Sequence, residues 1–154
     1  MKYKSYYLLC LALVIFDQLM KQIVVSSFNL GESMVINSYL SWTYIQNTGA
    51  AFSILSGGGA IQKAFLLAVS LFVSFMVMVW IHKTSAIHRQ RLFGQFILLS
   101  GALGNLLDRA QYGYVVDFID VHYQNYYWPV FNVADSLIFI GVILLLFERR
   151  QPSF

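Results

Sequence analysis

Asp135 is a carboxylate within an apolar stretch, residues 131–147, FNVADSLIFIGVILLLF. A charge at membrane depth costs on the order of 3 kcal/mol at the centre of a span and less near its ends. A second carboxyl, from Asp117 or Asp120, would give this charge a use, because two carboxyls about 3 Å apart cannot both ionise and share one proton. Such a pair can act as base toward water and as acid toward a carbonyl, and so hydrolyse a peptide bond without metal or cofactor. Strand alternation places Asp117 and Asp120 on opposite faces, and the pattern does not choose between them.

The same polar residues also have purely structural interpretations. Asn132 could cap a helix, with Asp135 as a favourable anion in its first turn. Asp17 and Lys21 are four residues apart on one helical face, so they could simply pair, with Lys21 reaching outward to the membrane surface. Asp108 has the wrong sign for a helix C-terminus, which indicates a polar network with a nearby cation or amide.

Three other kinds of site remain open from the residue types. His122 could be a ligand or base, although a single histidine in an aromatic loop is usually neither. Ser136 could be a nucleophile with Lys21 as its base, but no local motif supports this pairing. Asp117, Asp120, His122 and Asp135 could bind a metal ion, although these ligands alone specify none.

Composition identifies the elements that must position these groups as membrane helices. Of 154 residues, 58% are hydrophobic and 11% charged, whereas soluble domains carry about 25% charged residues. The net charge of +3 comes from scattered lysines and arginines, so no basic surface for nucleic acid is expected. The single cysteine, Cys10, excludes a disulfide framework.

Four apolar runs predict four transmembrane helices in one integral-membrane domain, residues 1–154. The first run is read as an uncleaved span and not as a signal peptide, because Asp17 and Lys21 stand within it. The third is short and contains three glycines, which favours close helix packing. The runs are about 6–25, 64–81, 92–107 and 131–147.

The distribution of lysine and arginine predicts that both termini are cytoplasmic. The positive charges lie before the first span, between the second and third, and after the fourth: Lys2, Lys4, Lys83, Arg89, Arg91, Arg149 and Arg150. In this topology Asp17, Lys21, Asp108 and Asp135 all lie toward the outer surface, with Asp135 roughly 6 Å below the start of its helix.

The outer connections contain two segments rich in β-forming residues, 33–46 and 114–123, which predict a small extracytoplasmic sheet. The fold class is therefore an all-α membrane protein with a small β-rich segment.

Five stretches in this order resemble the lipoprotein signal peptidases (signal peptidase II): DQLMK at 17–21, NTGAAFS at 47–53, GALGNLLDR at 101–109, GYVVDFID at 113–120 and FNVADS at 131–136. The resemblance implies a bacterial membrane aspartic endopeptidase. Such enzymes remove the signal peptide from prolipoproteins whose lipobox cysteine carries a diacylglyceryl group, and they cleave on the amino side of that cysteine.

The resemblance also assigns roles to particular residues. It makes Asp117, and not Asp120, the catalytic partner of Asp135. It implies substrate-binding or supporting roles for Asp17, Lys21, Asn47, Gly49, Asn105, Asp108, Arg109 and Asn132. It implies no cofactor and no metal, a lipid-modified prolipoprotein as substrate, contact with membrane lipid, and a monomer in the bacterial inner membrane with the active site at its outer face.

A small transporter or proton-conducting protein is the alternative function. It too would place acidic residues inside a helix bundle, but usually nearer the middle of the membrane. The position of Asp135 near one interface and the lack of charge in the second span favour the peptidase.

Overall fold

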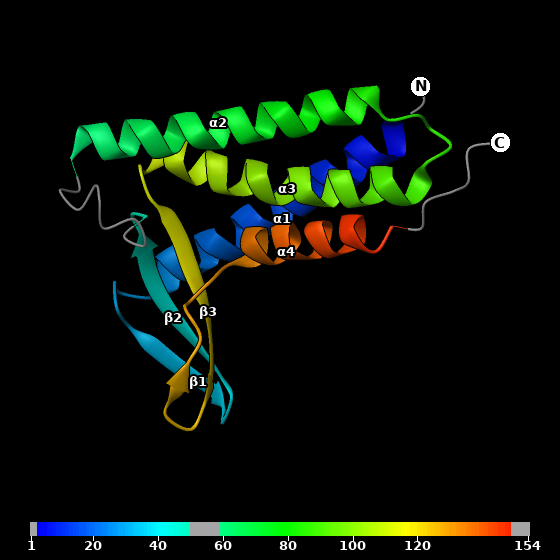
Figure 1. Ribbon diagram of the computed structural model, residues 1–154. Helices are drawn as coiled ribbons and strands as arrows, with labels where there is room; N and C mark the ends of the chain where they lie inside the picture. Colours follow the sequence, from blue (N-terminus) through cyan, green and yellow to red (C-terminus); the bar gives the residue numbers. More distant parts are fainter. Residues whose placement is uncertain (1–2, 50–58, 149–154) are drawn as a thin grey trace.

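The computed structural model describes residues 3–49 and 59–148. Its helices lie side by side, and a sheet projects sideways from one end of the bundle (Figure 1). Lys2, Arg149, Arg150 and positions 50–53 of the NTGAAFS stretch lie outside the described residues. The elements are α1 (Lys4–Ser27), β1 (Ser33–Asn37), β2 (Leu40–Asn47), α2 (Ala60–Lys83), α3 (Arg89–Gln111), β3 (Val115–Tyr123), β4 (Tyr126–Tyr127) and α4 (Val133–Leu146).

The third helix is the centre of the bundle, because α3 contacts α1, α2 and α4. Its glycines allow the close approach that the sequence predicts. A Cβ on Gly101 would meet the backbone oxygen of Ala134, and one on Gly104 would lie 2.6 Å from Asp17 Oδ2. The start of α4 and the side chain of Asp17 can therefore pack directly on the α3 backbone.

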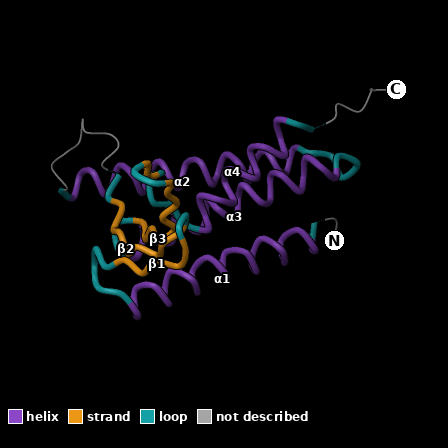
Figure 2. The backbone as a smooth tube through the Cα atoms, turned by 90° about the horizontal axis from the view of Figure 1, so that it is seen from below, coloured by secondary structure: helices purple, strands orange, loops and turns teal. Residues whose placement is uncertain are grey.

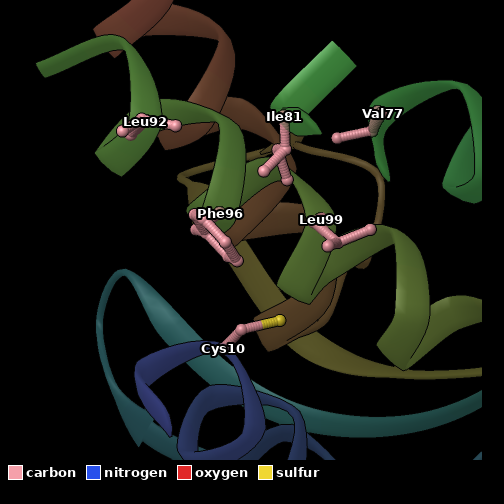
Figure 3. Close-up of a cluster of buried hydrophobic side chains, with 6 residues drawn as sticks. All are labelled: Cys10, Val77, Ile81, Leu92, Phe96 and Leu99. Atoms are coloured by element: carbon pink, nitrogen blue, oxygen red, sulfur yellow. The ribbon is translucent and has the colours of Figure 1, made fainter. Parts of the chain in front are cut away.

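An apolar core joins three of the helices away from the sheet. It contains Cys10 of α1, Val77 and Ile81 of α2, and three residues of α3. Figure 3 shows these side chains directed toward a common centre. The members from α3 are Leu92, Phe96 and Leu99.

The outer surfaces of the helices are apolar, and polar groups are buried inside. Large apolar side chains on these surfaces are about half exposed or more, a distribution that suits contact with lipid. Examples are Leu11, Ile15 and Leu19 of α1 and Phe72 of α2. By length and composition α1 and α2 could each cross a membrane, and α4 is a shorter apolar helix. Figure 2 shows the four helices running alongside one another.

The strands form one antiparallel sheet in the order β1-β2-β3-β4. The two predicted β-rich segments supply β1, β2 and β3, whereas the two-residue strand β4 was not predicted. A second apolar cluster, Val24, Tyr44, Val116 and Phe118, packs the sheet against the end of α1. The register pairs Ile45 with Asp117 and Asn47 with Val115, so the end of β2 lies beside the start of β3.

Candidate active site

The start of α4 is built as a capping box around Asn132 and Asp135. Asn132 is extended, with φ −131° and ψ −177°, and its side-chain oxygen accepts from the Asp135 N–H at 2.8 Å. Asp135 Oδ2 accepts in return from the Asn132 N–H at 3.3 Å. The capping interpretation of these two residues is therefore confirmed. It does not account for Asp135 Oδ1, which accepts from Asn105 Nδ2 of α3 at 2.7 Å.

Asp117 lies in β3 and is almost completely buried. Both of its oxygens accept from amides: Oδ1 from Asn132 Nδ2 at 2.6 Å, and Oδ2 from Asn47 Nδ2 at 2.9 Å. Asn132 thus contacts Asp117 with its side chain and Asp135 with its backbone and side-chain oxygen. The structure brings Asp117 and Asp135 to one site through this shared asparagine.

The three asparagine amides around the pair have fixed orientations. Each oxygen faces a group that can only donate: Asn132 Oδ1 faces the Asp135 N–H, Asn47 Oδ1 faces the Gly49 N–H at 2.8 Å, and Asn105 Oδ1 faces Lys21 Nζ at 3.2 Å. Each NH₂ group must therefore point to a carboxylate. Gly49 has φ +78°, a conformation that suits glycine.

Burial and the neighbouring charge of Asp135 raise the pKa of Asp117 to about 6. The hydrogen bonds from Asn47 and Asn132 and the positive charge of Lys21 act in the opposite direction. Two interacting carboxyls titrate as a pair. The Asp117 carboxyl therefore keeps its proton to a higher pH than an exposed aspartate does.

A buried charge cluster lies behind the pair, between α1 and α3. Lys21 Nζ is 2.9 Å from Asp17 Oδ2 and 3.0 Å from Asp108 Oδ2. The predicted pairing of Asp17 with Lys21 is confirmed, but the expectation that Lys21 reaches outward is wrong, because its side chain is only 3% exposed. Two buried carboxylates hold the ammonium inside. The predicted polar network at Asp108 is confirmed, since the Val116 N–H also donates to its Oδ2, at 3.0 Å.

The cluster also supports the start of α4. Asp17 Oδ1 accepts from the Ala134 N–H at 2.8 Å, which satisfies one of the otherwise unpaired donors of the first turn. Gln18, which the sequence reasoning did not single out, donates to Asp108 Oδ1 at 2.8 Å and to the Gly104 oxygen at 3.2 Å. A polar residue in an apolar run was the signal that could have identified it.

Arg109 lies in the last turn of α3 beside these carboxylates. The charges of Asp135, Asp108 and Asp117 act on its guanidinium. Its Nη1 donates to the Asn105 oxygen in a long bond of 3.4 Å. Among residues 3–49 and 59–148 this is the one hydrogen bond that the guanidinium makes, out of its five N–H donors.

The other candidate residues are not part of this arrangement. Asp120 accepts from Thr43 at 3.0 Å and lies 3.9 Å from His122, further along β3. Ser136 donates to the Asn132 oxygen at 3.0 Å, whereas Lys21 is engaged by the buried cluster. Within residues 3–49 and 59–148 no three histidine, cysteine or acidic side chains are grouped to hold a metal ion.

An apolar groove of about 440 Å³ opens beside Asp135. It is formed by the segment before α4 and by the exposed side of α4 itself. Its residues are Trp128, Phe131, Asp135, Ser136, Phe139 and Ile140. One end of the groove is therefore a carboxylate, and the rest offers apolar side chains.

Comparisons with known proteins first define the class, a bacterial membrane enzyme. One solved structure, described as a bacterial membrane enzyme determined by the in meso method at 1.9 Å resolution, matches with a TM-score of 0.85 and 34% identity, over 97% of this chain and 95% of that one. A second, at 2.3 Å resolution, has a TM-score of 0.81 and 32% identity, over 98% of this chain and 95% of that one.

The sequence comparisons then give the family. The profile described as signal peptidase (SPase) II matches residues 9–149. The lipoprotein signal peptidase of Pseudoalteromonas translucida is 44% identical over 91% of this chain and 84% of its own length, and that of Cellvibrio japonicus is 39% identical over 94% and 85%. The chain belongs to the lipoprotein signal peptidase (signal peptidase II) family, and the resemblance noted in its motifs is confirmed.

Proposed function

We propose that this chain is the membrane aspartic endopeptidase that removes signal peptides from diacylglyceryl-modified prolipoproteins, cutting on the amino side of the lipidated cysteine. Asp117 and Asp135 are its catalytic pair. The observation that carries this assignment is that Asn132 donates to Asp117 while it caps the turn that carries Asp135. Family membership supports the reaction, and the geometry supports the choice of residues.

The reaction needs only the pair and one water molecule. One carboxylate takes a proton from water as its oxygen bonds to the peptide carbonyl carbon, and the other carboxyl gives its proton to the carbonyl oxygen. The tetrahedral intermediate then collapses. The C–N bond breaks as the nitrogen takes the proton that one carboxyl holds, and a hydroxyl of the intermediate gives its proton to the other carboxylate, so the pair is singly protonated again.

The surrounding amides suit this chemistry. Asn47, Asn105 and Asn132 donate to three carboxylate oxygens but cannot themselves change protonation state near neutral pH. They stabilise negative charge on the pair without supplying a competing proton. Arg109, whose charge lies near Asp117 and Asp135, is the group that would bind a carbonyl oxygen of the substrate peptide.

We place the protein in the membrane from its charge distribution and from the length of α4. We place all four helices across the bilayer, with both termini cytoplasmic and the sheet at the outer face, as the lysine and arginine distribution predicts. With 14 residues, α4 covers about 21 Å, less than the hydrocarbon thickness of about 30 Å. If α4 ends at the inner face, Asp135 lies below the outer headgroups, at the depth of a peptide bond beside a membrane-anchored cysteine.

The lipid on the substrate then has a physical role. The two acyl chains remain in the bilayer and hold the scissile bond at the level of the pair, an orientation effect worth several kcal/mol in favourable cases. The groove beside Asp135 offers apolar surface at the same place. The partners of this chain are therefore a lipidated prolipoprotein and membrane lipid. We expect a monomer, because the proposed site draws on one chain only.

The test uses purified protein in detergent, without added metal or nucleotide, and two forms of one prolipoprotein. The form carrying the diacylglyceryl group should be cut to a product that begins with the lipidated cysteine, and the unmodified form should not. Cleavage of both forms at equal rates would refute the role of the lipid. Absence of cleavage together with ion or proton flux in vesicles would support the transporter alternative.

A further inference from the structure

The ammonium of Lys21 is engaged entirely inside the protein. Its Nζ lies within 3.2 Å of three oxygens, from Asp17, Asp108 and Asn105. An ammonium has three donors and no acceptor, so these three oxygens account for all of them. With its side chain 3% exposed, Lys21 cannot touch a bound peptide.

Lys21 donates a hydrogen bond to Asn105 in addition to its ion pairs with Asp17 and Asp108. Because the Asn105 oxygen faces an ammonium, its NH₂ must face the other way, and it donates to Asp135 Oδ1 at 2.7 Å. Asn132 Nδ2 supports the same orientation with a bond of 3.2 Å to Asn105 Oδ1. A continuous path of two hydrogen bonds thus runs from α1 through α3 to the catalytic turn of α4.

We propose that Lys21 is a positioning residue of the peptidase: acting through Asn105, it holds Asp135 Oδ1 in its place in the catalytic pair. This inference rests on the proposed function. Lys21 performs this task without contacting substrate or water at the reacting carbon.

The charges around the pair agree with this role. Asp117 is faced by Asp135 from α4, by Arg109 from α3 and by Lys21 from α1, and the neutral amides of Asn47 and Asn132 complete its surroundings. Asp135 is faced by Arg109 and Asn105 from α3, by Asn132, and by Asp117 from β3. The charge of Lys21 lowers the pKa of Asp117, so its removal should move the pH profile of cleavage upward.

The substitution Lys21→Met keeps a chain of similar length and removes the charge. Alone it leaves Asp17 and Asp108 buried without a cation, and such a protein can fail to fold. The decisive variant therefore combines Lys21→Met with Asp108→Asn, which leaves the cluster with the same net charge, one negative, as in the wild type. Asp108→Asn alone is its background, because that variant retains the Lys21–Asn105 bond. Lys83→Met, at the exposed inner end of α2, controls for loss of a lysine.

The measurement is kcat, KM and the pH dependence of cleavage of the lipidated substrate, on variants whose thermal unfolding shows them to be folded. Relative to Asp108→Asn, the combined variant should lose about tenfold or more in kcat, keep its KM, and show a pH profile moved up by about half a pH unit. Lys83→Met should match the wild type.

Three results would overturn the proposal. The first is a combined variant with the kcat and pH profile of Asp108→Asn, which would show that Lys21 has no effect on the catalytic pair. The second is a raised KM with kcat retained, which would indicate substrate contact. The third is a lower kcat with an unmoved pH profile, which a purely structural loss would give. Failure of the proposed function is separate: it would appear as a wild type that does not cut the lipidated substrate, or as an active Asp135→Asn.

Discussion

The proton shared by Asp117 and Asp135 gives the site its own pH dependence. Burial and the charge of Asp135 raise the pKa of Asp117 to about 6, so above this pH the Asp117 carboxyl loses the proton that it would give to the substrate. We expect kcat/KM to fall as pH rises through about 6, approaching tenfold per pH unit, because kcat/KM reports the free enzyme. Bound substrate excludes water and should move the same fall in kcat to higher pH. A steady-state profile between about pH 4 and pH 9 measures both, and a kcat/KM that rises through pH 6 would contradict this.

Asn132 combines two tasks that substitution can separate. Asn132→Ala removes both the helix cap and the donor to Asp117, and should cost about 1 kcal/mol of stability together with most of the activity. Asn132→Ser restores a good cap but not the amide that reaches Asp117 Oδ1. The serine variant should therefore recover thermal stability while cleavage stays low. Recovery of both would show that Asn132 acts only as a cap.

The contacts between residues distant in sequence mark the limit of prediction from the sequence. The capping arrangement of Asn132 and Asp135 is local, three residues apart, and the pattern predicts it. Lys21 is one of the groups that the sequence offers to compensate Asp108, together with Arg109 or an amide. Its burial between Asp17 and Asp108 depends on how α1 packs on α3, which the pattern of one apolar run does not show. The contact of Gln18 with Asp108 was missed for the same reason. Pattern alone also left Asp117 and Asp120 equivalent, whereas in the structure Asp117 contacts Asn132 and Asp120 contacts Thr43.

At the scale of elements, the close packing of α3 on α4 sets the position of the catalytic turn. A Cβ on Gly141 would lie 2.7 Å from the backbone nitrogen of Leu98 and 2.8 Å from its Cα, whereas one on Gly94 would meet side-chain atoms of Leu144 and Leu145 at 3.0 Å or more. Backbone cannot move aside as easily as the end of a side chain. We expect Gly141→Ala to destabilise the protein by about 1–3 kcal/mol and Gly94→Ala by clearly less. Thermal unfolding in detergent measures both, and equal effects would contradict the packing argument.

The elements themselves were largely predictable. Apolar runs identified all four helices within a few residues of their ends, and β-branched and aromatic residues identified β1, β2 and β3. The helix α3 extends beyond its predicted bounds, to Arg89–Gln111. Two polar residues in these extensions pair with other helices or their ends: Arg91 with Glu148 and Asp108 with Lys21. The strand β4 has only two residues, too few for a periodic pattern, and exists because it pairs with the end of β3.

For the whole molecule, the central claim about placement is that the sheet faces outward and the α2–α3 connection faces the cytoplasm. Cys10 is the single cysteine and is buried, so the wild type gives a low background for thiol labelling. Single cysteines at Ser38 and Gln124, both exposed in the sheet region, should react with an impermeant reagent added outside intact cells. A cysteine at Ser85, in the α2–α3 connection, should react only after the cells are opened. Labelling of Ser85 from outside would place the proposed site on the wrong side of the membrane.

The most direct test of the account is cleavage of a lipidated prolipoprotein by Asp117→Asn and Asp135→Asn. Asparagine keeps size and polarity, and it caps a helix as well as aspartate does, so both variants should insert and fold. It cannot take a proton, so each variant should lose about 100-fold or more in kcat, and the double variant should be no worse than either single one. Asp120→Asn, whose carboxylate contacts Thr43 instead, should retain most activity. Cleavage by Asp135→Asn near the wild-type rate would contradict the account and leave Asp135 as a helix cap alone.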